Sequence, residues 1–223
     1  MKCWAEKYCK GYPQKCGDFC QGRVILEVYY LQSNIPIRYQ YEPETLKIDP
    51  MDIETMKWIK KLIDGNVSNW VENGHNLLLW GENKGNGKTT AACMIAGKYI
   101  REQAKALKSL DPVVYFIKTA KFLEEIRQQF NDPTPDFAYK MKLVEEVPLL
   151  IIDDIGAEKP SDWVRERLLN IIDERYSNRR ATIYTSNCSM RTLSENLHDR
   201  ITDRIRDSYI LQFRGISKRG LEF

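Results

Sequence analysis

The stretch Asn76-Leu-Leu-Leu-Trp-Gly-Glu-Asn-Lys-Gly-Asn-Gly-Lys-Thr-Thr90 decides the fold of this chain. It begins with an apolar segment typical of a buried strand, continues through a glycine-rich loop, and leads into a helical run from Ala91 to Lys108. Strand, glycine loop and helix in this order are the layout of a phosphate-binding loop, in which N–H groups at the positive end of the helix face an anion. The stretch therefore predicts an α/β protein that binds a nucleoside triphosphate.

Four residues of this loop are of the types that phosphate binding requires. Gly85 and Gly87 allow backbone conformations that other residues avoid, so that successive N–H groups can point at a β-phosphate. Lys88 would neutralise the β and γ oxygens, and the Thr89 hydroxyl would ligate magnesium. The residues expected to bind ATP here are Gly85, Asn86, Gly87, Lys88, Thr89 and Thr90.

The loop departs from the strict G-x4-G-K-T spacing. Counted back from Gly87, that spacing places Glu82 where glycine is usual, and Gly81 lies one residue too early. The sequence thus predicts a loop one residue longer than the motif. The alternative, a chance glycine-rich turn before a helix, is disfavoured by the strand and helix signals on either side.

Two acids follow the apolar run that begins at Val147. A strand buried on both faces would end at Asp153 and Asp154, at the sheet edge where open α/β sheets bind ligands. We expect Asp153 to hold the magnesium shell, directly or through water, and Asp154 to orient or deprotonate the attacking water. The alternative is a helix cap or a solvated turn.

Further strand signals complete a sheet. Ala181 to Ser186 is an apolar strand followed by Asn187, whose amide suits a group that senses the γ-phosphate or positions the water; its alternative is a turn former. Val113 to Ile117 and Ser208 to Phe213 are the remaining strands. Five strands alternating with helices predict a parallel sheet flanked by helices.

Arg200 and Arg204 are four residues apart on a short predicted helix, and therefore on one face. An arginine that one subunit presents to a neighbour's nucleotide would stabilise charge in the transition state. The acids Asp199, Asp203 and Asp207 offer the alternative of a surface helix covered with ion pairs.

Four of the six cysteines lie within the first twenty residues, at Cys3, Cys9, Cys16 and Cys20. In a reducing compartment four close thiols more readily share a tetrahedral zinc than form disulfides, and the metal would supply folding free energy that so short a segment lacks. Scattered reduced thiols are the alternative. Val24, Leu26 and Val28 then alternate and lead into a linker that ends near Pro50.

Composition and charge limit which partners and which cellular location we expect. The chain has 223 residues, 43% of them hydrophobic, and a net charge of +3 from 34 basic and 31 acidic residues, so any DNA site must be a local patch. The longest apolar runs are far shorter than the roughly 20 residues that cross a bilayer. The charged amino terminus does not resemble a signal peptide, so we expect no membrane partner and a cytoplasmic address.

Together the motifs resemble a known family, the AAA+ helicase loaders of the DnaC and DnaI type and the related IstB transposition ATPases. The resemblance covers roughly Ser33 to the end of the chain. It rests on Ser-Asn-Ile-Pro-Ile-Arg-Tyr39, Gly-Asn-Gly-Lys-Thr-Thr90, Leu-Leu-Ile-Ile-Asp-Asp-Ile-Gly156, Tyr-Thr-Ser-Asn187, Asp-Arg-Ile-Thr-Asp-Arg-Ile205 and Phe213-Arg-Gly-Ile-Ser-Lys-Arg219.

The resemblance implies roles for these residues. Asp153 and Asp154 would be the Walker B acids, Asn187 would be sensor 1, and Arg204 would be an arginine finger acting between self-associated subunits. The segment from Ile35 to Tyr39 would lie against the adenine. The implied organisation is a cysteine-rich zinc segment at 1–32, a linker at 33–50 and an AAA+ ATPase domain at 51–223 without a carboxyl-terminal helical lid.

The implied activity is slow ATP hydrolysis, stimulated by single-stranded DNA or oligomerisation, that loads a hexameric DnaB-type replicative helicase onto single-stranded DNA. The chain resembles loaders encoded by phages or prophages of Gram-positive bacteria. Lys118, Lys121 and Phe122 are candidate DNA contacts, with an ordinary packing helix as the alternative. Two other functions are open: an IstB-like transposition helper, and a zinc-bearing adaptor with a static nucleotide site.

Overall fold

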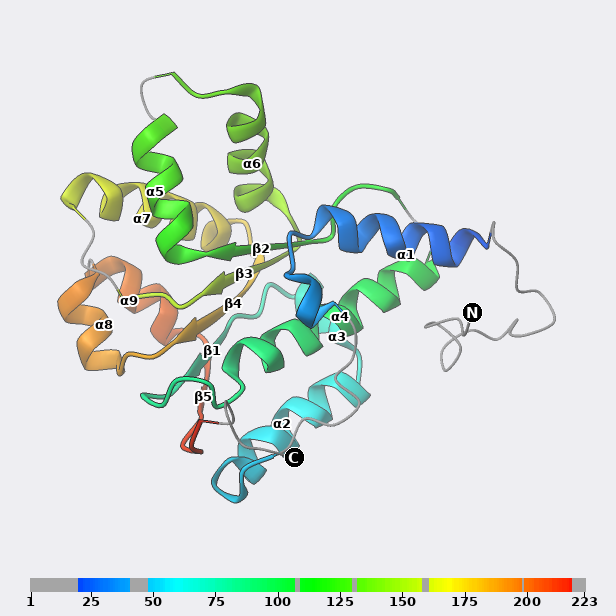
Figure 1. Cartoon of the computed structure of the whole chain (residues 1–223), viewed down its shortest axis with the longest axis horizontal. Coiled ribbons are helices and arrows are strands. Elements are labelled where there is room, and N and C mark those ends of the chain that lie inside the picture. Colours follow the sequence, from blue (N-terminus) through cyan, green and yellow to red (C-terminus); the bar gives the residue numbers. More distant parts are fainter. Residues whose placement is uncertain are drawn as a thin grey trace.

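Five parallel strands form the centre of the computed structural model, and each lies where an apolar run predicts it (Figure 1). The structure describes residues 20–40, 48–106, 109–129, 132–157, 161–197 and 199–217. The strand order across the sheet is β2-β3-β4-β1-β5, and every neighbouring pair is parallel. The strands are β1 (Leu77–Trp80), β2 (Val114–Lys118), β3 (Leu149–Asp153), β4 (Ala181–Ser186) and β5 (Tyr209–Gln212).

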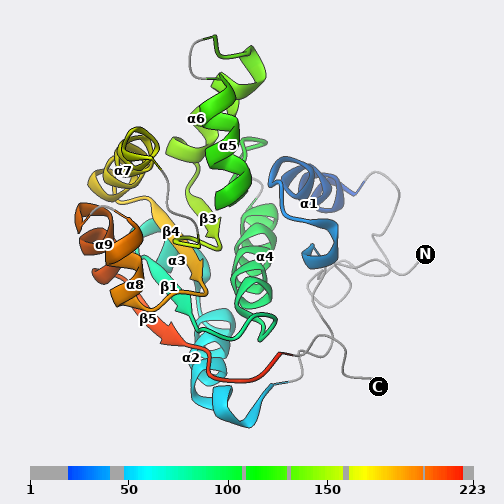
Figure 2. The same ribbon diagram turned by 60° about the vertical axis from the view of Figure 1, so that its left-hand side comes forward.

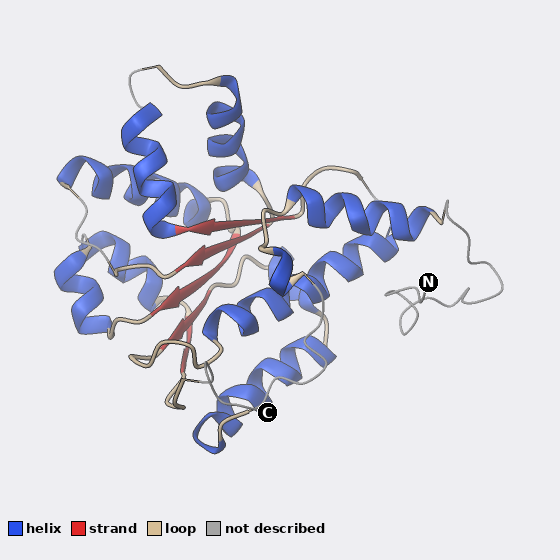
Figure 3. Cartoon of the chain, viewed as in Figure 1, coloured by secondary structure: helices blue, strands red, loops and turns tan. Residues whose placement is uncertain are grey.

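Helices cover both faces of the sheet, as Figures 2 and 3 show. Successive strand side chains point to opposite faces, so Leu77 and Leu79 belong to one hydrophobic core and Leu78 belongs to the other. The first core is covered by α1 (Gln21–Gln32), α2 (Ile53–Asp64), α3 (Val67–Glu72) and α4 (Lys88–Ala106). The second is covered by α5 (Thr119–Gln129), α6 (Pro135–Glu146), α7 (Asp162–Ser177), α8 (Met190–Asn196) and α9 (Asp199–Arg206).

The helix α1 covers the stretch in which Val24, Leu26 and Val28 alternate, ahead of the expected linker at 33–50. Helical spacing brings Leu26, Tyr29 and Tyr30 to one buried face that belongs to the core shared with α4. The apolar residues therefore satisfy a period of 3.6 as well as a period of 2, and packing against α4 decides between them.

Arg175 on α7 ties the second helical layer to the sheet. Its side chain is fully buried, and that burial lowers its pKa to about 9. The guanidinium donates to the Thr182 hydroxyl and the Ala181 carbonyl at the start of β4, at 3.0 and 2.6 Å. It also donates to the carbonyls of Val144 and Val147, at 3.1 and 2.9 Å, where α6 ends. Arg175 thus fixes α6 and α7 relative to β4, the strand that leads to the site.

Candidate functional site

The predicted phosphate loop runs from Gly81 to Gly87 between β1 and α4, one residue longer than the strict motif. Gly85 and Gly87 have φ values of 77° and 110°, conformations that favour glycine, as the sequence predicts. A Cβ on Gly81 would lie 2.0 Å from the Phe213 carbonyl oxygen, so the chain beyond β5 requires glycine at this position. Glu82, which stands where the strict motif has glycine, is exposed.

Lys88 is the first residue of α4 and points back into this loop. Its ammonium group donates to the Gly81 and Asn83 carbonyls at 2.8 and 2.9 Å and to Asn86 Oδ1 at 3.0 Å, which uses all three of its protons. Burial lowers the pKa of Lys88 to about 8, although the charges of Asp154, Asp153 and Asp52 oppose the shift. The loop therefore surrounds a partly desolvated cation with groups that a phosphate could replace.

Asp153 ends β3 beside the first turn of α4. Its Oδ1 accepts hydrogen bonds from the hydroxyls of Thr89 and Thr185, at 2.8 and 2.7 Å, and its carbonyl accepts one from Thr119 at 2.8 Å. A carboxylate next to a hydroxyl is an oxygen donor set of the kind that magnesium prefers. The residues present therefore fit the expected metal, and Thr89 with Asp153 would hold it.

Asp154 and Asn187, two of the three expected catalytic groups, are in contact. The Asn187 amide donates to Asp154 Oδ1 at 2.6 Å. Asp154 has a φ of 61°, a left-handed conformation in which a residue other than glycine is strained. This turn follows β3 at the same end of the sheet as the loop after β1. The structure therefore brings Lys88, Thr89, Asp153, Asp154 and Asn187 to one edge, as the strand assignments predict.

The Phe213-Arg-Gly motif closes over the loop, which the sequence did not reveal. The carboxylate of Asp52, 1% exposed, accepts from the Arg214 and Gly215 N–H groups at 2.6 and 3.1 Å. The Asn83 side chain donates to the Gly215 carbonyl at 3.1 Å. A Cβ on Gly215 would lie 2.5 Å from Asp52 Oδ2, so glycine is required there. Asp52 is the main residue of this edge that the sequence missed, because its partners lie over 160 positions away.

The two residues expected to contact adenine differ in surroundings. Ile35 is 3% exposed and belongs to the first hydrophobic core, so its side chain has almost no surface to offer a base. Tyr39 is half-buried, and the Arg38 guanidinium lies 5.0 Å from the centre of its ring. Tyr39 remains the better candidate of the two.

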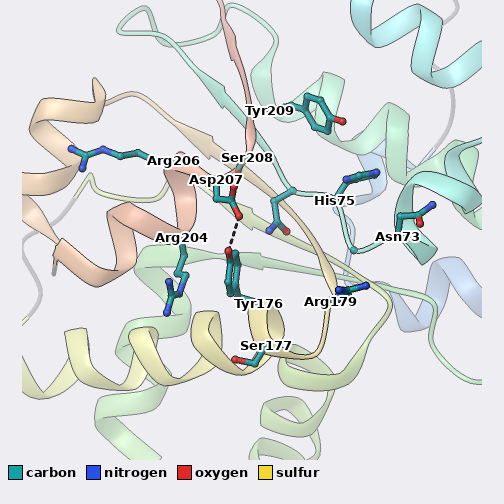
Figure 4. A pocket seen from close by; sticks show the side chains of 12 residues that line it. Asn73, His75, Tyr176, Ser177, Arg179, Arg204, Arg206, Asp207, Ser208 and Tyr209 are labelled. Atoms are coloured by element: carbon teal, nitrogen blue, oxygen red, sulfur yellow. Dashed lines mark hydrogen bonds between the residues drawn. The ribbon is translucent and has the colours of Figure 1, made fainter.

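Arg204 lies at the opposite end of the sheet from the phosphate loop. It lines a polar hollow of about 750 Å³ at the amino ends of β1, β4 and β5, with Asn76, Arg179 and Tyr209 also on its wall. Figure 4 shows Arg204 beside Tyr176, whose hydroxyl donates to Asp207 at 2.6 Å.

Asp173 on α7 holds both arginines of the predicted pair. Its two oxygens accept from Arg200 and Arg204 at 2.8 and 2.9 Å, which confirms that the pair shares one face of α9. The Arg204 guanidinium also lies 4.6 Å from the centre of the Tyr176 ring, and its hydrogen bond to Asp173 raises its pKa. Arg204 is thus held by Asp173 and Tyr176 of the same chain, at the end of the sheet opposite the phosphate loop.

The expectation that Phe122 stacks on DNA bases is wrong. Its side chain is 1% exposed and belongs to the second hydrophobic core, where α5 packs on the sheet. Lys118 is exposed at the end of β2, and the Lys121 side chain is 79% exposed. The two lysines therefore keep a surface for a phosphate backbone, whereas the aromatic ring does not.

The expected zinc ligands Cys3, Cys9 and Cys16 lie outside the described residues. Cys20 is described as a free thiol at the amino end of α1. Within the described part of the chain, no cluster of three or more histidine, cysteine or acidic residues could hold a metal ion. In the same described ranges, every helix is too short or too polar to cross a bilayer.

Comparisons with known proteins bear on this site. A sequence model of the IstB-like ATP-binding protein family matches residues 51–219. The protein named as the ATP-binding protein of insertion sequence IS1162 from Pseudomonas fluorescens is 33% identical over 117 residues, 52% of this chain and 46% of that protein. The replicative helicase loader DnaI of Bacillus subtilis is 30% identical over 117 residues, 52% of this chain and 34% of that protein. The matched region spans less than half of each relative.

A crystal structure of DnaI has a similar fold, with a TM-score of 0.62 at 25% identity over 81% of this chain and 95% of that one. The fold is accordingly that of an AAA+ P-loop NTPase, and the resemblance to DnaC, DnaI and IstB proteins is confirmed. The family match includes the phosphate loop, Asp153 and Asp154 at the end of β3, and Asn187. The chain belongs to the family of IstB-like ATP-binding proteins.

Proposed function

We propose that this protein is an ATPase that loads a hexameric, DnaB-type replicative helicase onto single-stranded DNA. One observation carries the choice of partner: the likeness to the DnaI structure extends over 95% of that chain at 25% identity. The nucleotide site supports the ATP dependence, because the groups expected to bind the phosphates and magnesium and to activate the water lie together at one edge of the sheet.

The residues would divide the work as follows. The loop N–H groups and Lys88 bind the phosphates, and Thr89 with Asp153 holds magnesium, which supplies charge neutralisation when bound. Asp154 accepts a proton from the attacking water, and Asn187 keeps that carboxylate oriented through its 2.6 Å hydrogen bond. Exposed Lys118 and Lys121 would contact the phosphates of single-stranded DNA.

We further propose that copies of the chain associate so that Arg204 reaches the nucleotide of a neighbour. The hollow that Arg204 lines lies at the amino ends of β1, β4 and β5, whereas the phosphate loop of the same chain lies at the carboxyl end of β1. Arg204 therefore cannot serve its own site without a rearrangement of α9.

Nucleotide affinity should fall as the pH rises through about 8. Burial lowers the pKa of Lys88 to about 8, and phosphates bind the protonated side chain. Alkaline pH therefore removes the positive charge from the unbound protein and weakens nucleotide binding. For a group with that pKa, the dissociation constant for ADP should rise about tenfold between pH 7 and pH 9. Titration of a fluorescent nucleotide at each pH measures this.

A matched variant isolates the contribution of Lys88. Lys88→Arg keeps its charge throughout this range, so its affinity should change far less with pH than that of the wild type. Equal slopes in the two proteins would show that another group, or the nucleotide itself, causes the pH dependence.

The loader function is tested by capture of partners from host lysate. Tagged wild-type protein with ATP should retain the replicative helicase, and the amount should differ with ADP. Lys88→Ala should lose this nucleotide dependence because the loop can no longer bind phosphates. Lys84→Ala removes the same charge from an exposed position of the same loop and should behave as wild type. A helicase that is never retained contradicts the proposal.

A transposition helper is the second candidate, favoured by the 33% identity to the insertion-sequence protein. It uses the same nucleotide chemistry but delivers target DNA to a transposase. The same capture distinguishes the two functions, since a transposase in place of the helicase would support this one.

A further inference from the structure

Thr185 lies where β3 and β4 run side by side, next to the two acids. The register pairs Ile152 of β3 with Tyr184 of β4, so the following residues, Asp153 and Thr185, are also neighbours. Thr185 is 2% exposed. Its hydroxyl is thus a buried polar group that must find partners within the protein.

Both partners of this hydroxyl belong to the acid pair. Its single proton is donated to Asp153 Oδ1 at 2.7 Å, and its oxygen accepts from the Asp154 N–H at 2.9 Å. One side chain therefore fixes the orientation of one carboxylate and the backbone of the next residue.

The second contact holds a strained turn. Asp154 has a φ of 61°, which costs free energy and persists only where the surroundings maintain it. Thr185 accepts two hydrogen bonds from this turn: its hydroxyl oxygen accepts from the Asp154 N–H, and its carbonyl oxygen accepts from the Ile155 N–H at 2.9 Å. This backbone conformation places the Asp154 carboxylate within hydrogen-bond distance of the Asn187 amide.

The hydrogen bond from Thr185 to Asp153 is one of two that the same carboxylate oxygen accepts. Asp153 Oδ1 accepts from Thr89 as well as from Thr185, but Thr89 is itself an expected magnesium ligand. Of the two donors to the Asp153 carboxylate, Thr185 is therefore the one that is not itself an expected magnesium ligand. A partner of a metal ligand that orients it usually changes metal affinity or activity by about 10–100-fold when removed.

We propose that Thr185 is a positioning residue that orients Asp153 for magnesium and Asp154 for water activation, an inference that rests on the proposed ATPase function. It assigns a role to a position of the Tyr-Thr-Ser-Asn motif that carried none in the sequence. The proposal differs from a purely structural role, in which the Thr185 hydroxyl would only satisfy its own hydrogen-bonding capacity within the strand.

The test compares Thr185→Val, which keeps the shape and loses the hydroxyl, with Thr185→Ser, which keeps the hydroxyl. Thr182→Val is the matched control: Thr182 is on the same strand, 1% exposed, and bonded to Arg175, at the strand's other end. Nucleotide affinity is measured in EDTA and across a magnesium titration, together with kcat, KM and Tm.

For Thr185→Val we expect affinity in EDTA within about twofold of the wild type, a magnesium requirement raised about tenfold, and kcat lowered about tenfold or more. Thr185→Ser should stay within about threefold on both measures. Thr182→Val should lower Tm without moving the magnesium requirement.

Two results would overturn the inference in distinguishable ways. A Thr185→Val protein with a lowered Tm but the magnesium requirement and kcat of the wild type would show that the hydroxyl is only structural. A wild-type protein whose nucleotide binding ignores magnesium would instead refute the proposed function, and the inference with it.

Discussion

Replacement of Asp154 by asparagine should lower ATP hydrolysis by about 10²–10⁴-fold and leave nucleotide affinity within about threefold of the wild type. The carboxylate that accepts a hydrogen bond from Asn187 can also accept a proton from water, and an amide cannot replace it. Asparagine tolerates the left-handed conformation of this position at least as well as aspartate, so the fold should be retained. Phosphate release and fluorescent-nucleotide binding measure the two quantities.

The control for this substitution is Asp162→Asn. Asp162 is a 98% exposed carboxylate at the start of α7 that pairs with Arg165, and its loss should leave hydrolysis unchanged. If Asp154→Asn hydrolysed ATP within about twofold of the wild type, another group would have to activate the water. A loss of nucleotide affinity as large as the loss of turnover would instead make Asp154 a binding residue.

The parts of this site that the sequence predicts are those carried by local patterns. Apolar runs mark the strands. Asp153 and Asp154 mark the carboxyl end of one strand, and Asn187 marks the carboxyl end of the next. The carboxyl ends of parallel strands lie at one edge of the sheet. The order of apolar runs and polar residues along the sequence is therefore enough to predict that Lys88, Asp154 and Asn187 lie close together.

The parts that the sequence did not predict depend on contacts between distant segments. Asp52 binds Arg214 and Gly215 through N–H groups, which leave no signature in residue type. The role of Thr185 appears only once β3 and β4 are in register. Phe122 occupies a position in an amphipathic helix where burial and exposure differ by a rotation of the helix, which packing alone decides.

Replacement of Arg204 by alanine should lower the hydrolysis of the assembled protein by about 10³-fold or more, because it removes a cation that would stabilise transition-state charge at a neighbour's site. Arg200→Ala is the matched control. Arg200 is on the same helix and binds the same Asp173, but it does not line the hollow. It should therefore keep most of the wild-type rate. Equal losses in the two variants would point to the ion pairs with Asp173 as a structural requirement.

A mixing experiment separates action between subunits from action within one. Lys88→Ala retains Arg204 but cannot bind nucleotide, whereas Arg204→Ala binds nucleotide but lacks the finger, so each should be inactive alone. Mixed assemblies contain interfaces in which an intact Arg204 faces an intact phosphate loop, and hydrolysis should reappear there. Action within one subunit predicts no recovery at any ratio. Because Arg204 lies at the opposite end of the sheet from its own loop, recovery is the result that the position of the hollow leads us to expect.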